Sequence, residues 1–266
     1  MLAQTQVERV VPKFESFIDR FPNFRSLARA STADVLREWK GLGYNARAVR
    51  LRGLAQAVVR RYRGALPRGR EELRSLPGVG PYTASAIRAF AFDLHDAPID
   101  TNVRRIVQRL CFGLEYPRPV APRRLDECAR ELVPATRAHD WSSAMMDLGA
   151  SICTARAPKC LLCPLRADCV ASPIDAVRLE RLRAAAKAGR AKNALPYERT
   201  TRYARGRIVD RLRDLAPGER ISLLDLHHQL GAAIPGRTVA DVRDAVAALE
   251  RDGLVTRDGN HVALRE

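Results

Sequence analysis

Four of the six cysteines lie within seventeen residues of one another, in the spacing C-x6-C-x2-C-x5-C. A single folded loop can gather four thiols at this spacing around one metal centre. Structural zinc sites more often use two C-x2-C pairs, and this segment contains only one, but the spacing alone leaves an iron–sulfur cluster, zinc and disulfides all open. The four residues are Cys153, Cys160, Cys163 and Cys169. The other two, Cys111 and Cys128, stand apart in helical patterns and are expected to be small buried hydrophobic residues.

A glycine-rich turn, Leu76-Pro77-Gly78-Val79-Gly80, precedes the cysteines and leads into a helical pattern. The two glycines permit a tight turn whose backbone N–H groups point outward at the start of the next helix. Such groups bind a phosphate oxygen without regard to base sequence. Many Gly-x-Gly turns only redirect the chain, but the residues that flank this one favour a phosphate contact. We therefore predict that Gly78, Val79 and Gly80 bind a DNA backbone.

Asp100 lies twenty residues after Gly80 and is followed by Thr101 and Asn102. A carboxylate beside a sugar can stabilise the positive charge that develops when a glycosidic bond breaks. The same Asp can also cap the following helix, because its oxygen accepts hydrogen bonds from free N–H groups of the first turn. The two roles are compatible, and the residues alone favour the cap.

The 266 residues have a formal net charge of +16, from 46 Lys and Arg against 30 Asp and Glu. This excess favours a polyanionic partner, because each neutralised phosphate releases condensed counterions. The sequence shows no apolar run of about twenty residues for a spanning helix, and no signal-peptide pattern. We expect a DNA-binding monomer in the cytoplasm, associated with the nucleoid, without a membrane partner.

Helical patterns follow one another through the first 170 residues, so this part is predicted to be all-α. Ser31-Thr32-Ala33-Asp34 resembles a capping box at the start of one of these helices, with Asp in place of Glu. We expect a helical domain with the glycine turn over 1–98 and a helical cysteine domain over 99–172. Residues 173–201 form a basic, partly helical linker. In 202–266, helical patterns at 202–215, 221–230 and 239–251 precede two short apolar stretches joined by Asp258-Gly259-Asn260. This hairpin signal together with the three helices predicts a winged helix.

Residues 76–102 resemble the helix-hairpin-helix base-excision DNA glycosylase superfamily. Within it, the chain is most similar to the A/G-specific adenine glycosylases of the MutY type. Further matching stretches lie at 1–7, 41–48 and 144–150, and the likeness covers about residues 1–172. It implies an all-α helix-hairpin-helix glycosylase fold whose four clustered cysteines hold a [4Fe–4S] cluster with a structural role.

The resemblance also implies roles at the reaction centre. Asp100 would stabilise the sugar cation, and Asn102 would orient Asp100 or a water. Relatives that also cut the strand carry a Lys two residues after the second hairpin glycine, where its amine attacks the sugar. Here that residue is Tyr82, so we predict a monofunctional glycosylase. Thymine glycosylases that act on G·T mismatches also have Tyr there, which makes a thymine or uracil glycosylase the alternative.

Gln4 and Tyr44 align with family residues that wedge into the opened duplex, with Leu2 and Thr5 beside them. The family's general-acid Glu would lie two residues before Met1, so we expect translation to begin upstream. Without that Glu, a disarmed DNA-binding protein is the second alternative. Most bacterial relatives end in a Nudix-like domain, where this chain has the expected winged helix. The predicted function is excision of adenine mispaired with 8-oxoguanine or guanine in double-stranded DNA.

Overall fold

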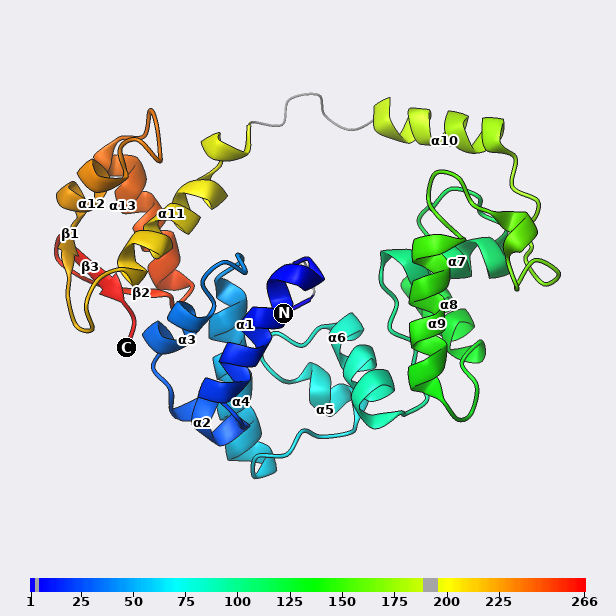
Figure 1. Cartoon of the computed structure of the whole chain (residues 1–266), viewed down its shortest axis with the longest axis horizontal. Helices are drawn as coiled ribbons and strands as arrows, with labels where there is room; N and C mark the ends of the chain where they lie inside the picture. The colour runs from blue at the N-terminus through cyan, green and yellow to red at the C-terminus, as the bar shows by residue number, and fades with distance from the viewer. Residues whose placement is uncertain (3–4, 189–195) are drawn as a thin grey trace. The chain divides into compact units, whose positions relative to one another are not determined.

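The computed structural model describes residues 1–2, 5–188 and 196–266, without the side chains of 187 and 188. The chain is mostly helical and ends in a small sheet (Figure 1), as predicted. None of the helices in these ranges is long and apolar enough to cross a membrane.

The described residues form two compact units. The first comprises Met1–Pro67, Leu76–Gly78 and Asn193–Glu266, and the second comprises Arg68–Ser75 and Val79–Lys192. This grouping differs from the segments 1–98, 99–172, 173–201 and 202–266 expected from the sequence. The difference arises because the tail packs on the first helices of the chain.

The first unit begins with four helices, α1 (Val7–Arg20), α2 (Phe24–Arg29), α3 (Thr32–Glu38) and α4 (Ala46–Tyr62). The Ser31 hydroxyl caps α3 by accepting from the Asp34 N–H at 3.0 Å, as the sequence predicted. Only part of the apolar pattern of α1 is buried: Val10 and Phe17 enter the core, whereas Phe14 stays exposed.

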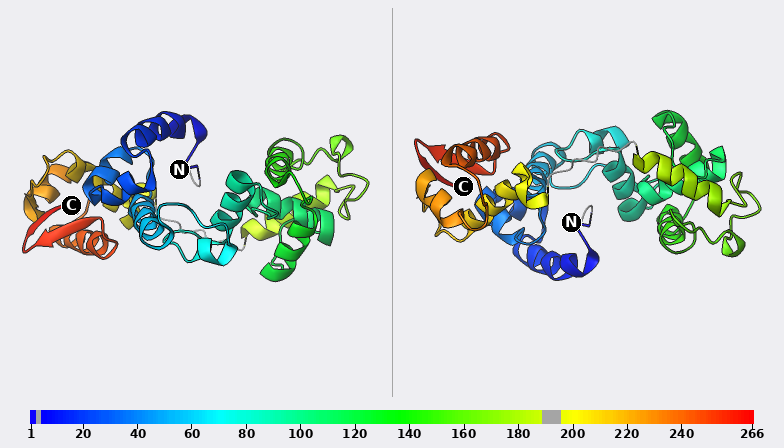
Figure 2. Two further views of the ribbon diagram at one scale, coloured as in Figure 1. Left: turned by 90° about the horizontal axis from the view of Figure 1, so that it is seen from below. Right: turned by 90° about the horizontal axis from the view of Figure 1, so that it is seen from above.

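The tail of the first unit has the elements of a winged helix. These are α11 (Thr201–Arg213), β1 (Ile221–Ser222), α12 (Leu223–Leu230), α13 (Val239–Arg251), β2 (Val255–Asp258) and β3 (His261–Leu264). The strands form an antiparallel sheet in the order β1-β3-β2, which lies against α13 (Figure 2). Gly259 turns the predicted hairpin at φ 57°. The pattern at 221–230 is not entirely helical, because Ile221 and Ser222 pair with β3 before α12 begins.

One hydrophobic core joins this tail to α2–α4. Leu36 and Trp39 are buried in the same cluster as Ile208 and Leu212 of α11. Removing such side chains from water stabilises a fold by about 1.5–3 kcal/mol each, so the winged helix is an integral part of the first unit.

The second unit contains α5 (Arg70–Arg74), α6 (Pro81–Ala86), the π-helical segment η1 (Ile87–Ala91), α7 (Thr101–Phe112), α8 (Pro122–Glu131), α9 (Ala138–Ser151), the 3-10 turn η2 (Cys160–Leu162) and α10 (Ala176–Ala188). Asp96 is 1% exposed and accepts from Arg70 and Arg88 at 2.8 Å each. Arg70 also bonds Asp126 of α8, so this network around the buried Asp96 holds the segment that leads to Asp100.

Cys111 of α7 and Cys128 of α8 form a disulfide. The sequence predicted two separate buried thiols at these positions. The prediction was wrong because it treated each helix alone, whereas α7 and α8 pack against each other and bring the two sulfur atoms together.

Candidate active site

Asp100 is the N-cap of α7. Its Oδ1 accepts from the backbone N–H of Asn102 at 2.8 Å and of Val103 at 2.7 Å. Among the described residues, Oδ2 has no hydrogen-bond partner. One carboxylate oxygen therefore orders the helix, and the other is available to a substrate.

Tyr82 lies in the first turn of α6 and is 38% exposed. Burial raises the pKa of its phenol, and the nearby charge of Asp100 raises it further. The phenol is consequently protonated at neutral pH and lies close enough to Asp100 for the two groups to interact. This places two of the predicted catalytic residues in one neighbourhood.

Asn102 is held by a buried arginine that the sequence analysis did not single out. Arg105 donates to Asn102 Oδ1 at 3.0 Å, to the Cys153 carbonyl at 2.8 Å and to the Gly149 carbonyl at 2.6 Å. Helices α7 and α9 pack closely at this point, because a Cβ at Gly149 would lie only 2.7 Å from Asn102 Cβ. The available signal was a pair of arginines, 105 and 109, four residues apart among apolar neighbours.

Arg109 connects α7 to the first of the clustered cysteines. It is 1% exposed, and its Nη1 donates to Cys153 Sγ at 3.3 Å and to the Thr154 carbonyl at 2.8 Å. Its Nη2 is buried without a hydrogen-bond partner, and Arg109 makes no ion pair with any carboxylate of the described residues. A buried cation beside a sulfur atom is better satisfied by a thiolate than by a neutral thiol.

All four clustered cysteines are free and half-buried. Burial raises the pKa of the Cys169 thiol, a backbone hydrogen bond from Ala171 lowers it, and the charges of Cys153, Cys163 and Cys160 raise it. Within the described ranges, however, no three Cys, His, Asp or Glu side chains converge closely enough to coordinate an ion. The donor chemistry and the buried Arg109 fit a thiolate-bound centre, while the present side-chain positions are more open than a ligated site.

The glycine turn of the helix-hairpin-helix has the backbone geometry that its sequence predicts. Gly78 is exposed at φ 78°, and a Cβ there would lie 3.0 Å from Arg50 Cβ. Gly80 is also exposed and is the N-cap of α6, with Pro81 as its first residue. Val79 between them is buried.

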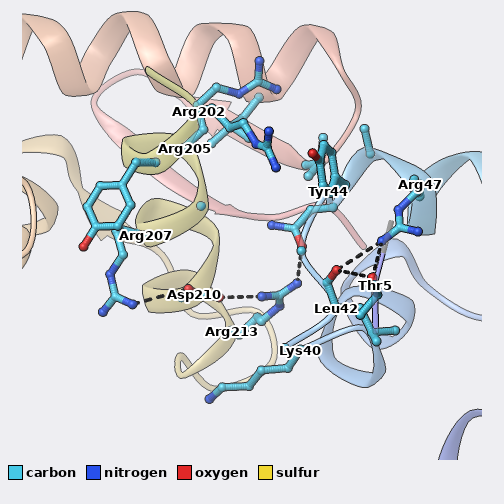
Figure 3. A pocket seen from close by; sticks show the side chains of 18 of the residues that line it. Thr5, Lys40, Leu42, Tyr44, Arg47, Arg202, Arg205, Arg207, Asp210 and Arg213 are labelled. Atoms are coloured by element: carbon cyan, nitrogen blue, oxygen red, sulfur yellow. Dashed lines mark hydrogen bonds and ion pairs between the residues drawn. The ribbon is translucent and has the colours of Figure 1, made fainter. Parts of the chain in front are cut away.

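The other described residues predicted to contact DNA, which are Leu2, Thr5 and Tyr44, lie in the first unit. Tyr44 is 42% exposed and has a left-handed backbone at φ 47°. The Thr5 hydroxyl donates to the Leu42 carbonyl at 3.2 Å, and Arg47 donates to both of these oxygens (Figure 3). Leu2 is 61% exposed, and Gln4 lies outside the described residues. The structure thus brings Thr5 to the loop of Tyr44, and Asp100, Asn102 and Tyr82 to the second unit.

The comparisons with known proteins agree with this architecture. A model of the HhH-GPD superfamily of base excision DNA repair proteins matches residues 1–130. The adenine DNA glycosylase of Mycolicibacterium smegmatis is 41% identical over 217 residues, which cover 80% of this chain and 69% of the relative.

Solved structures show the same fold. A thermostable thymine-DNA glycosylase is similar at a TM-score of 0.59 and 32% identity, over 64% of this chain and 79% of that chain. A trapped endonuclease III–DNA covalent intermediate is similar at a TM-score of 0.52 and 26% identity, over the same shares. On the identity and coverage of its sequence relative, the chain belongs to the adenine DNA glycosylase family.

Proposed function

We propose that this chain is a monofunctional DNA glycosylase that removes adenine mispaired with 8-oxoguanine or guanine. The observation that carries the proposal is Asp100, which caps α7 with Oδ1 and leaves Oδ2 available beside a Tyr. A carboxylate at that place stabilises an oxocarbenium-like sugar. The sequence similarity to adenine DNA glycosylases supports adenine as the base that is removed.

Asn102 is proposed to orient Asp100 or the attacking water. Its side-chain oxygen accepts from Arg105, so its amide N–H groups remain free to donate. A positioned donor near the carboxylate orders a water without contributing a charge. The final nucleophile is that water.

The Tyr82 phenol cannot form an imine with the sugar, so we propose that the strand is left intact after base removal. Borohydride should therefore trap no covalent complex with DNA, and the abasic product should break only under alkali. A trapped complex that persists in the Tyr82→Phe variant would show that another residue acts as an amine nucleophile and would refute this part of the proposal.

We further propose that Cys153, Cys160, Cys163 and Cys169 hold a [4Fe–4S] cluster with a structural role. The buried Arg109, which donates to Cys153 Sγ, supports a negatively charged centre there. When bound, the cluster would fix a loop that carries the exposed Arg156, Lys159 and Arg166 toward phosphates. About four irons and four sulfides per purified chain would support the cluster, whereas stoichiometric zinc without iron would refute it.

The proposed partner is double-stranded DNA with the mismatched or oxidised pair, bound by a monomer at the nucleoid in the cytoplasm. Leu2, Gln4, Thr5 and Tyr44 would hold the opened duplex, because the base must leave the stack before chemistry. The exposed amides at Gly78 and Gly80, on either side of Val79, would anchor a phosphate.

A single-turnover assay on four duplexes tests the assignment. The duplexes contain adenine opposite 8-oxoguanine, adenine opposite guanine, thymine opposite guanine, and a normal pair. Cleavage by alkali at the adenine of the first two is the expected result. Cleavage at thymine alone would overturn the proposal in favour of the second candidate, which the 32% identity to a thymine-DNA glycosylase favours.

A further inference from the structure

A basic cavity of about 1310 Å³ lies within the first unit. One wall is the segment 41–47, which carries Tyr44 and ends in the first turn of α4, and the other is α11 of the winged helix (Figure 3). Eight cationic side chains line it against three carboxylates. The cations are Arg9, Lys40, Arg47, Arg50, Arg202, Arg205, Arg207 and Arg213, and the carboxylates are Asp210, Asp214 and Asp252.

Three of these cations have no ion-pair or hydrogen-bond partner among the residues that the structure describes. Lys40, Arg205, Arg207 and Arg213 each pair with one of the three carboxylates, and Arg47 bonds main-chain oxygens and Thr5. Arg9, Arg50 and Arg202 are exposed and form neither an ion pair nor a side-chain hydrogen bond with the described residues. Positive charge without a counter-charge in a cavity attracts an anion from outside.

The cavity also has a stacking site. The Arg202 guanidinium lies 3.8 Å from the centroid of the Tyr44 ring and 5.8 Å from that of Tyr197. Tyr44 and Tyr197 are 42% and 54% exposed. Arg202 therefore already stacks on the Tyr44 ring, and the Arg47 guanidinium lies 5.5 Å from the centroid of the same ring. A nucleobase is a flat group that also stacks on a guanidinium plane, so the outer face of Arg202, supported by Tyr44, has the chemistry to hold an unstacked base.

The two walls of the cavity are tied together. Arg213, on α11, has a side chain that is 3% exposed and donates to the Leu36 carbonyl at 2.8 Å and to Asn45 Oδ1 at 2.7 Å. Its third bond is to Asp210 at 2.6 Å. Because Asn45 follows Tyr44 directly, this bond fixes the Tyr44 loop against α11, and the cavity is formed before any ligand arrives.

The charge of the winged helix is concentrated on the same wall. The helix α11 carries five arginines and one aspartate. The third helix of the tail, α13, carries two arginines against three acidic residues. In helix-turn-helix proteins a later helix of the motif usually enters the major groove, but a helix with net negative charge is poorly suited to approach phosphates.

We propose that the winged helix binds DNA through α11 and not through α13. The ligand is one nucleotide of the DNA substrate whose base, out of the stack, lies on the face of the Arg202 guanidinium that is turned away from Tyr44, with its flanking phosphates at Arg9 and Arg50. This proposal rests on the DNA substrate proposed above, and it assigns the tail a share in holding the opened duplex.

Two matched substitutions, each of which removes one arginine, test this proposal. Arg202→Ala and Arg243→Ala each delete one exposed arginine of the tail, from α11 and from α13. Binding to the adenine·8-oxoguanine duplex, measured by anisotropy, should weaken about tenfold in the first variant, which lies within the range for loss of one stacked base. It should change less than about twofold in the second. Equal effects of the two variants, or a larger effect of Arg243→Ala, would overturn the proposal.

Two further variants separate stacking from charge. Arg202→Lys should bind as weakly as Arg202→Ala, because the ammonium keeps the charge but has no planar face. Arg50→Ala should lower the slope of log affinity against log salt by about one, as expected for one lost phosphate contact. Full affinity in Arg202→Lys together with an unchanged salt slope in Arg50→Ala would refute the nucleotide site.

A fluorescent base distinguishes this site from simple attraction of DNA. With 2-aminopurine placed in turn at the position opposite the adenine and at its neighbours, one position should show quenching that Tyr44→Ala and Arg202→Ala abolish. Quenching that neither variant alters would refute the site. If wild-type protein removes no adenine but the variants show these binding effects, the proposed function fails and the nucleotide site stands. If wild-type protein removes adenine normally but the variants bind and quench like wild type, the nucleotide site fails and the proposed function stands.

Discussion

Asp100 combines a structural and a chemical role, and one substitution can separate them. In Asp100→Asn the side-chain oxygen still accepts from Asn102 and Val103, the two N–H groups now 2.8 and 2.7 Å from Oδ1. The cap, typically about 0.5–2 kcal/mol, is therefore kept. Only the favourable interaction of the negative charge with the helix N-terminus is lost, about 0.3–1 kcal/mol.

The catalytic loss should be much larger. An amide has no charge to stabilise the sugar cation, and loss of one preorganised electrostatic contact costs about 2.7–4 kcal/mol, or 10²–10³ in rate. We expect single-turnover excision to fall at least that far in Asp100→Asn, with DNA affinity unchanged and the melting temperature lowered by at most about 4 °C.

Asp100→Ala is the matched control, because it removes the cap and the charge together. It should lose the same activity and a further 0.5–2 kcal/mol or so of unfolding free energy. Excision within tenfold of wild type in Asp100→Asn would refute the electrostatic role. Equal unfolding free energies for the Asn and Ala variants would refute the capping role.

Three other perturbations test the surroundings of the site. Gly149→Ala would place a Cβ 2.7 Å from Asn102 Cβ, so α7 and α9 must separate. We expect the free energy of unfolding to fall by about 1–3 kcal/mol and excision to be slower. A urea unfolding curve indistinguishable from that of wild type would contradict the close packing. Arg213→Met should cost about 1–3 kcal/mol for each buried acceptor left unpaired, measured in the same way. Burial raises the pKa of Asp126, but the hydrogen bond and charge of Arg70 outweigh it and leave that pKa below its usual value. The stabilisation is therefore complete above about pH 4 and is lost as pH falls through the folded-state pKa; thermal unfolding of Asp126→Asn should lack this acid-dependent contribution.

Several features of the chain follow from residues that are near one another in the sequence. The Ser31 cap, the Gly259 hairpin turn and the exposed Gly78 turn were predicted and are present in the structure. The cap at Asp100 was predicted for the same reason: the N–H groups it satisfies are two and three residues away. Local geometry of this kind depends on dihedral preferences and short-range hydrogen bonds, which the sequence determines directly.

The catalytic and DNA-contacting roles of the predicted residues are still predictions. The residues that contact them in the folded structure could not be named from the sequence. Arg105 reaches residues 44 and 48 positions away, at Gly149 and Cys153. The spacing of Arg105 and Arg109 among apolar residues indicates that the two could be buried. It does not indicate what they would contact, because their partners are largely main-chain carbonyls, which any sequence provides.

The sequence by itself determined the helices, the turns, the cysteine set and the winged-helix elements of this protein. Tertiary structure alone decided that the tail shares a core with α2–α4 and that Arg213 bonds Asn45 from 168 residues away. Apolar periodicity shows that a helix has a face to bury, but it does not show which other element will cover that face. The basic cavity beside Tyr44 exists because α11 is that element.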